Sequence, residues 1–246
     1  VAAAWAGGIL AALVVAAVAG AVHAEWSGIT EGSSRPALPF TGAVVLAILV
    51  FGFGFPGFGL AVAAAALAAA ALAGPRPWRP AGVVYASALG MSLLALRAGP
   101  DYGLVAIALV VGVVAATDIG AFVAGRAIGG PKLWPRVSPK KTWSGAIGGL
   151  VAGVAAGYLF ATAFAIPVAP GLLAVTLVLS IASQLGDLFE SHVKRRFGAK
   201  DSGRLMPGHG GMMDRVDGLV FASVTALAIG IVHGGLDHPA QGFVMW

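Results

Sequence analysis

The sequence contains no cysteine and little charge: Asp, Glu, Lys and Arg make up 10% of its 246 residues, whereas 59% are hydrophobic. The absence of cysteine excludes disulfides and metal sites built on thiolates. Soluble domains carry about 25% charged residues, so the scarcity of charge argues against a soluble globule. Apolar stretches recur along the whole length, which is typical of a protein that crosses a membrane several times.

Eight apolar segments are each long enough to cross about 30 Å of hydrocarbon as a helix. They are residues 1–22, 38–54, 56–74, 81–97, 102–125, 143–166, 171–189 and 216–234. Strands of a membrane β-barrel would alternate apolar and polar residues, and these segments do not. The sequence therefore predicts an all-α fold, a polytopic integral membrane helical bundle with about eight transmembrane helices. Pro56 and the nearby glycines predict a tight hairpin between two spans, with one long kinked helix as the alternative.

The basic residues lie almost entirely in alternate loops. If the spans alternate in direction, every Lys and Arg except Arg97 falls on one side of the membrane. The positive-inside rule assigns that side to the cytoplasm. Both ends of the chain are then external, and a cytoplasmic start predicts a ninth helix in the full-length protein. Residues 23–37 are interpreted as a polar loop between helices.

Two of the loops on the basic side, 126–142 and 190–215, carry most of the ionisable groups. We therefore predict a catalytic transmembrane region over residues 98–246. Residues 1–97 are interpreted as transmembrane helices for packing, with lipid access or dimer contacts as further roles.

Four carboxylates lie close to the ends of apolar segments. Asp118 and Asp187 lie at or inside the basic ends of their spans, while Asp214 and Asp217 are three residues apart at the start of another. Such groups are costly in a membrane and usually face a polar cavity. If these carboxylates meet, their mutual repulsion favours the binding of a cation between them. Because carboxylate oxygens are hard ligands, the favoured cation is Mg²⁺. The alternatives are helix capping for Asp214 and Asp217, and a structural partnership for Asp118.

Basic residues alternate with these acids, which favours a site for a metal-bound polyphosphate. The candidates for phosphate binding are Lys140, Lys141, Lys194, Arg195 and Lys200. Attraction to anionic lipid headgroups is the alternative explanation for a basic loop. His209, Gly210 and Gly211 precede a predicted helix start, where backbone N–H groups can bind an anion. A structural turn is the alternative for these three residues.

The second loop resembles the signature of the phosphatidate cytidylyltransferases, the CDP-diacylglycerol synthases. The matching positions are Ser191, Lys194–Arg195, Lys200–Asp201, Pro207 to Gly211, Asp214–Arg215 and Asp217. The segments "DIGAFVAGR" (118–126), "SPKKTWSGAIGG" (138–149) and "GDLFES" (186–191) also resemble the family. Ser144 departs from it, because many relatives have Glu there, and no role is assigned to it. The resemblance covers residues 100–234.

The resemblance implies transfer of the cytidylyl group of CTP to phosphatidate, giving CDP-diacylglycerol and pyrophosphate, in a homodimeric enzyme of the bacterial inner membrane. It implies Mg²⁺, with K⁺ as a second cation, and metal ligands that include Asp187, Asp214 and Asp217. Catalysis is then assigned to these three residues with Lys194 and Arg195. Substrate binding is assigned to Asp118, Lys140, Lys141, Ser191, Lys200, Asp201, His209, Gly210, Gly211 and Arg215.

Three other functions are weighed against this one. A CTP-dependent lipid-alcohol (polyprenol) kinase would use similar cations but attack the γ-phosphorus. A membrane transporter or channel would line a path across the bilayer with its charges, whereas these gather on one side. An inactive structural relative would not need the intact signature. No nucleic-acid partner is expected.

Overall fold

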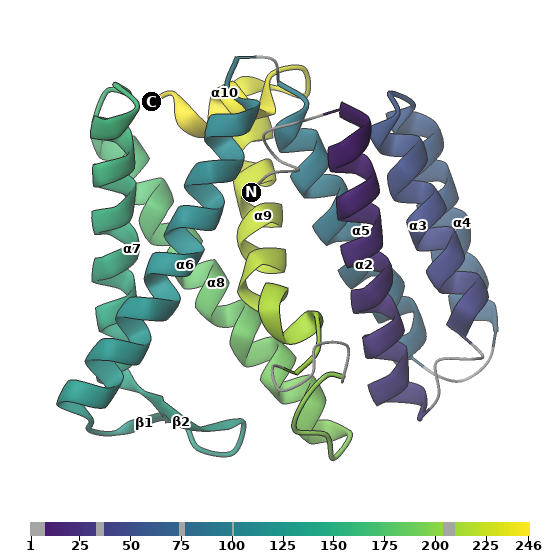
Figure 1. Ribbon diagram of the computed structural model, residues 1–246, viewed down its shortest axis with the longest axis horizontal. Helices are drawn as coiled ribbons and strands as arrows, with labels where there is room; N and C mark the ends of the chain where they lie inside the picture. Colours follow the sequence, from purple (N-terminus) through teal and green to yellow (C-terminus); the bar gives the residue numbers. More distant parts are fainter. Residues whose placement is uncertain (1–7, 33–36, 74–76, 100, 204–209) are drawn as a thin grey trace. The chain divides into compact units, whose positions relative to one another are not determined.

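A computed structural model describes residues 8–32, 37–73, 77–99, 101–203 and 210–246 (Figure 1). The chain divides into two compact units. The first unit comprises residues 1–94 and 196–216, and the second comprises residues 95–195 and 217–246. The described residues are overwhelmingly helical, which confirms the all-α class. The segment 196–216 thus belongs to the same compact unit as the N-terminal helices.

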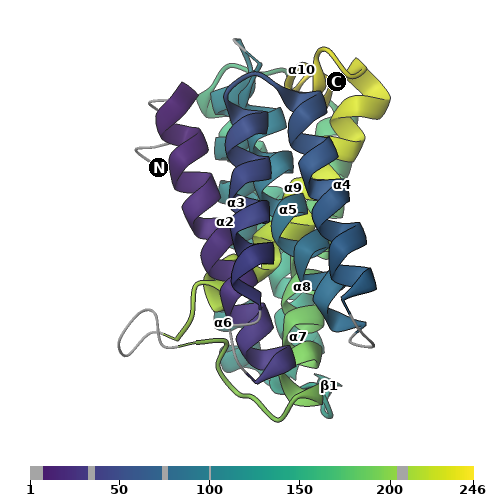
Figure 2. The same ribbon diagram turned by 90° about the vertical axis from the view of Figure 1, so that its right-hand side faces the viewer.

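The first unit is built on α2 (Gly8–Glu31), α3 (Leu38–Gly52), α4 (Pro56–Leu72) and most of α5 (Trp78–Arg97). Helix α3 packs between α2 and α4 (Figure 2). The hairpin predicted near Pro56 is confirmed, because α3 ends at Gly52 and α4 begins at the proline. Gly54 in this turn has φ +95°, a conformation that side chains with a Cβ rarely adopt.

The predicted polar loop over residues 23–37 is wrong for its first nine residues, because α2 continues to Glu31. Two side chains of this stretch, His23 and Trp26, bond to neighbouring segments of the chain. His23 Nδ1 lies 2.7 Å from Thr41 Oγ1, and Trp26 Nε1 donates to the carbonyl of Trp78 at 2.8 Å. Once such groups are paired, they no longer prevent a helix from continuing through an apolar environment.

The second unit contains α6 (Gly103–Ile128), α7 (Trp143–Ala163), nearly all of α8 (Pro170–Arg196), most of α9 (Met213–Gly234) and the short α10 (Pro239–Val244). Strands β1 (Lys132–Trp134) and β2 (Ser138–Thr142) form an antiparallel hairpin between α6 and α7. Figure 1 shows this hairpin at the opposite end of α6 and α7 from α10.

Both predicted loops contain regular structure. The loop 126–142 includes the hairpin, and its first three residues belong to α6. Within the loop 190–215, residues 190–196 complete α8 and residues 213–215 begin α9. At these two loops α6, α8 and α9 extend past their apolar segments, because charged residues tolerate helical geometry well at an interface and hydropathy alone does not mark where a helix ends.

Helix α7 packs through its small residues. Its buried positions Gly145, Gly149, Gly153, Gly157 and Ala161 recur every fourth residue and form one stripe. A Cβ at Gly153 would lie 2.6 Å from Thr117 Oγ1 on α6 and 2.9 Å from Ser180 Cβ on α8. Small residues at this spacing let membrane helices approach closely.

Among the described residues, six helices are long and apolar enough to cross a membrane: α2, α5, α6, α7, α8 and α9. Helices α3 and α4 are also apolar but have only 15 and 17 residues. All eight apolar segments therefore correspond to helices, and the chain is an integral membrane protein.

Candidate active site

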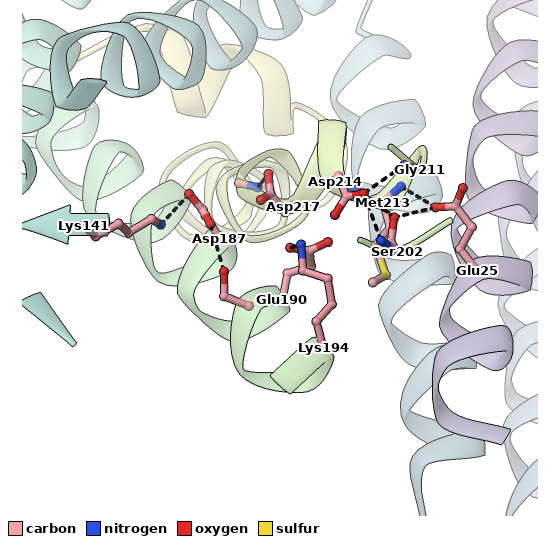
Figure 3. Close-up of polar contacts among 12 residues, drawn as sticks. Glu25, Lys141, Asp187, Glu190, Lys194, Ser202, Gly211, Met213, Asp214 and Asp217 are labelled. Atoms are coloured by element: carbon pink, nitrogen blue, oxygen red, sulfur yellow. Dashed lines mark hydrogen bonds and ion pairs between the residues drawn. The ribbon is translucent and has the colours of Figure 1, made fainter. Parts of the chain in front are cut away.

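Three carboxylates meet where α8 and α9 pack together in the second unit. Asp187 and Glu190 lie one turn apart on α8, and Asp217 comes from α9 (Figure 3). One carboxylate oxygen from each lies within 4.8 Å of the others. Glu190 is buried, whereas Asp187 and Asp217 are partly exposed. The prediction that Asp187 and Asp217 converge from distant parts of the sequence agrees with this geometry.

Gly186 allows the two helices to approach this closely. A Cβ at this position would lie 2.5 Å from the carbonyl oxygen of Asp217 and 3.2 Å from the Cα of Gly218. Any larger residue would push α9 away, and Asp217 would move from Asp187 with it. Nearby, the rings of Phe189 and Phe221 lie 5.4 Å apart and fill the same helix contact.

Lysine side chains flank the acidic cluster. Lys141 of β2 forms an ion pair with Asp187. Lys194 forms an ion pair with Glu190 one turn along α8, at 2.6 Å. Two ammonium groups therefore face three carboxylates.

Two of the acids also accept hydrogen bonds. Ser191 Oγ donates to Asp187 Oδ1 at 3.4 Å, and the Gly218 N–H donates to Asp217 Oδ1 at 2.7 Å. Asp187 and Asp217 are thus held in place by groups on their own helices, while lysines hold Asp187 and Glu190.

A cavity of about 540 Å³ opens beside Asp187. Its charged lining consists of Asp118, Arg126, Lys140, Lys141 and Asp187. Apolar and small residues of α6, α7 and the hairpin, together with Gln184 of α8, complete the wall. A partly apolar cavity with a few convergent charges is the usual form of a small-molecule site. This cavity presents basic and acidic side chains together. An anion that binds with a metal would need both, because the basic groups contact the anion and the carboxylates contact the metal.

The hairpin holds two of the lysines at this cavity. Strand β2 pairs with β1 in the register Lys132 with Thr142 and Trp134 with Ser138. The Thr142 hydroxyl then accepts the N–H of Gly145 at 3.1 Å and caps α7. Trp134 stacks on His192 of α8, with ring centroids 6.4 Å apart. The hairpin is therefore fixed to α7 and α8.

Asp214 lies in the first unit, at the beginning of α9. Its Oδ2 accepts hydrogen bonds from the N–H of Ser202 (3.0 Å), the hydroxyl of Ser202 (2.8 Å) and the N–H of Gly211 (2.8 Å). Glu25 of α2 contacts the same stretch of chain (Figure 3). Asp214 as a metal ligand stays a prediction.

The other predicted residues divide between the two units. The second unit contains Asp118, Lys140, Lys141, Ser191, Lys194 and Arg195 beside the cluster or on its helices. The first unit contains Lys200, Asp201, Gly210, Gly211 and Arg215. Lys200, Asp201 and Arg215 are exposed, and Gly210 has φ +82°. His209 lies outside the described residues. The roles of all these residues stay predictions.

Sequence reasoning missed two acids. Glu190 falls at the start of the predicted loop 190–215, although its spacing of three residues from Asp187 places both on one face if α8 continues. Glu25 was assigned to a polar loop. Nothing in the sequence near Glu25 indicates its partners, which lie more than 170 residues away.

The acidic cluster fits a divalent cation. Octahedral Mg²⁺ binds oxygen at about 2.1 Å, so neighbouring ligand oxygens lie about 3 Å apart and opposite ones about 4.2 Å. Three oxygens within 4.8 Å of one another need only small side-chain rotations to meet that geometry. The donors are all carboxylates, which suits a hard cation. Asp187, Glu190 and Asp217 could therefore hold Mg²⁺.

Comparison with known proteins gives a consistent result. The sequence model of the cytidylyltransferase family matches residues 1–232. The phosphatidate cytidylyltransferase of Brucella suis biovar 1 (strain 1330) is 52% identical over 168 residues, which cover 68% of this chain and 62% of that protein. The phosphatidate cytidylyltransferase of Bacillus subtilis (strain 168) is 43% identical over 122 residues, 49% of this chain and 45% of that protein. The match therefore spans less than two thirds of the length of these relatives.

Proposed function

The chain belongs to the cytidylyltransferase family, and from this we propose that it transfers the cytidylyl group of CTP to phosphatidate, giving CDP-diacylglycerol and pyrophosphate. The observation that carries the proposal is the cluster of Asp187, Glu190 and Asp217 with lysines on both sides, next to a cavity. The names of its relatives support the choice of substrates.

The reaction joins two anions. A phosphate oxygen of phosphatidate attacks the α-phosphorus of CTP, and the bond from that phosphorus to the bridging oxygen of the β-phosphate breaks. Pyrophosphate leaves with the bonding electrons, in line with the attacking oxygen. Because the lipid brings its own ionised nucleophile, the protein needs no serine or cysteine nucleophile. Its tasks are positioning and neutralising charge.

The carboxylates and cations divide these tasks. Asp187, Glu190 and Asp217 would hold Mg²⁺, and we keep Asp214 as a further proposed ligand and K⁺ as a proposed second cation. A bound Mg²⁺ would supply positive charge to the phosphate oxygens of CTP. Lys140 and Lys141 line the cavity and would bind phosphate oxygens there. The remaining basic groups proposed for binding substrate and pyrophosphate are Lys194, Arg195, Lys200 and Arg215.

The location of these groups suits a lipid and a water-soluble substrate. The cluster lies toward the ends of α8 and α9, near the hairpin, where a headgroup at the membrane surface and CTP from the aqueous phase can meet. We propose that this end faces the cytoplasm of a bacterial inner membrane, because the loops on this side carry nearly all the basic residues. A homodimer is also proposed.

The deciding experiment identifies both products. Purified protein is incubated with phosphatidate in mixed micelles, CTP labelled at the α-phosphate and Mg²⁺. We expect labelled CDP-diacylglycerol and unlabelled pyrophosphate, with activity lost in excess EDTA and restored by Mg²⁺. Labelled CDP and a phosphorylated lipid, formed when polyprenol replaces phosphatidate, would instead identify a kinase. No turnover of phosphatidate, or full turnover after exhaustive chelation, would contradict the proposal.

A further inference from the structure

Glu25 of α2 binds the start of α9, although nearly 190 residues separate them in the sequence. Its Oε1 accepts the N–H of Met212 at 2.9 Å, and its Oε2 accepts the N–H of Met213 at 2.8 Å. The hydroxyl of Ser202 lies 3.0 Å from the same Oε2. The first N–H groups of a helix have no partner within it, so a carboxylate from another helix satisfies them here.

Two glycines lie against the Glu25 carboxylate, at positions where a side chain would meet it. A Cβ at Gly203 would lie 2.6 Å from Glu25 Oε1, and a Cβ at Gly211 would lie 2.5 Å from Glu25 Oε2. The Gly211 position would also place that Cβ 2.1 Å from Ser202 Oγ. Two glycines on either side of the carboxylate therefore allow a close approach that other residues would prevent. Gly203, Gly211 and Ser202 therefore lie closely around the Glu25 carboxylate.

Ser202 connects Glu25 to Asp214. Its hydroxyl lies 3.0 Å from the Glu25 carboxylate and 2.8 Å from Asp214 Oδ2 (Figure 3). Its N–H also donates to Asp214 Oδ2. Ser202 is buried. A displacement of Glu25 would therefore change both the start of α9 and the hydrogen bonds that orient Asp214.

We propose that Glu25 is a positioning residue for the reaction, which holds Ser202 and the N-terminus of α9 and thereby fixes the orientation of Asp214. The inference rests on the proposed function. It assigns a role in the reaction to the first described helix, which carries none of the residues predicted to bind metal or substrate. Glu25 acts through hydrogen bonds and not by touching either substrate.

The substitution Glu25→Gln tests this with little change in shape. The amide has one acceptor oxygen where the carboxylate has two, and its NH₂ group would face a backbone N–H. At least one of the bonds to Met212 and Met213 is then lost. Ser202→Ala is the second variant, since it removes the hydroxyl link but leaves the two backbone bonds. Asp101→Asn, at an exposed acid before α6, is the matched control.

Two readouts are measured for each variant. Hydrogen exchange by mass spectrometry should be faster in a peptide covering residues 210–217 of Glu25→Gln, and unchanged in the hairpin peptide 132–142. Turnover should fall about 10-fold or more, with a higher Mg²⁺ concentration for half-maximal activity and an unchanged KM for phosphatidate. Ser202→Ala should show the same fall in turnover and the same higher Mg²⁺ requirement. Its hydrogen exchange in the peptide 210–217 should rise less than that of Glu25→Gln. Asp101→Asn should match the wild type in both.

The outcomes separate this inference from the proposed function. A wild-type protein that makes no CDP-diacylglycerol refutes the function, while the exchange data still decide whether Glu25 holds α9. Wild-type exchange and kinetics in Glu25→Gln would overturn the inference. An equal rise of KM for both substrates, with an unchanged Mg²⁺ requirement, would also overturn it. If Glu25→Gln does not fold, wild-type kinetics in Ser202→Ala would reject the link to Asp214.

Discussion

At the scale of single residues, the acid at the end of α2, Glu31, is paired with one specific cation, Arg79. Arg79 donates two hydrogen bonds to Glu31, from Nε to Oε1 at 2.9 Å and from Nη2 to Oε2 at 2.6 Å. Both side chains are almost fully buried. The guanidinium also donates to the carbonyl of Ala73 and lies over the ring of Phe40. Lysine could not replace it, because a single ammonium cannot reproduce the forked geometry.

The acids of the cluster are different, because they lie next to one another. Asp187, Glu190 and Asp217 bring three negative charges within a few ångströms, and two lysines offset only part of that charge. Such an arrangement is unfavourable for stability alone and is typical of a site that binds a cation.

Asp217→Asn should therefore remove activity while the protein still folds. The amide keeps the shape of the side chain but offers the cation a weaker, neutral ligand. We expect CDP-diacylglycerol formation to fall at least about 100-fold, and the protein to elute normally in size-exclusion chromatography. Asp237→Asn, at an exposed acid after α9, is the control and should keep full activity. Near-normal turnover in Asp217→Asn would remove Asp217 from the proposed metal site.

At the scale of elements, close helix contacts position the cluster. The stripe of small residues on α7 brings α6 and α8 against it, and a buried hydrogen bond from Thr117 Oγ1 to Ser180 Oγ at 2.8 Å connects α6 with α8. In a bilayer the hydrophobic effect adds little to helix association, so packing and hydrogen bonds of this kind decide the arrangement. The wall of the cavity depends on this arrangement of α6, α7 and α8.

Gly153→Leu should destabilise the second unit. The new side chain would meet Thr117 and Ser180 at distances below van der Waals contact, so α6 and α8 must move apart. Overpacking of this kind typically costs about 1–3 kcal/mol. We expect a lower thermal unfolding midpoint in detergent, measured by the fluorescence of tryptophan.

Gly112→Leu provides the matched control for that experiment. Gly112 is exposed on α6, and a Cβ there would meet nothing within 4 Å. The unfolding midpoint of this variant should stay at or slightly above that of the wild type, because leucine favours the helix more than glycine does. Equal midpoints for Gly153→Leu and Gly112→Leu would show that the α7 stripe does not limit packing.

At the scale of the whole molecule, the charge distribution predicts an orientation in the membrane. The hairpin carries Lys132, Arg136, Lys140 and Lys141, whereas the opposite end of the second unit carries Asp237. The positive-inside rule then assigns the hairpin to the cytoplasm. An active site on that side would have access to CTP.

Because the chain has no cysteine, single substitutions can test this orientation directly. Arg136→Cys and Asp237→Cys each introduce the only thiol at an exposed position. In spheroplasts, a membrane-impermeant maleimide should label Asp237→Cys and leave Arg136→Cys unlabelled. Inside-out vesicles should give the reverse pattern. Labelling of Arg136→Cys from the outside would place the proposed active site on the wrong side for CTP.

Much of this architecture could be predicted from the sequence. Eight apolar segments gave eight helices, because a chain in lipid must satisfy its backbone hydrogen bonds internally. The pairing of Asp187 with Asp217 was also predictable, since both are charged groups at the ends of spans. The helix ends were less predictable, and the hairpin of β1 and β2 was missed, because its strands are short and polar.

The fold class, the apolar segments and the acids at their ends follow from the order of the amino acids alone, because hydrophobicity and the cost of a buried charge act on each segment separately. Three contacts emerge only once the chain is folded: Glu190 joins Asp187 and Asp217, Lys141 reaches Asp187 from the hairpin, and Glu25 binds the start of α9. Most of these contacts join segments that are distant in the sequence. Glu190 lies in the part of α8 that continues past the apolar segment. The contacts depend on how closely glycines let the backbones approach, which no local pattern records.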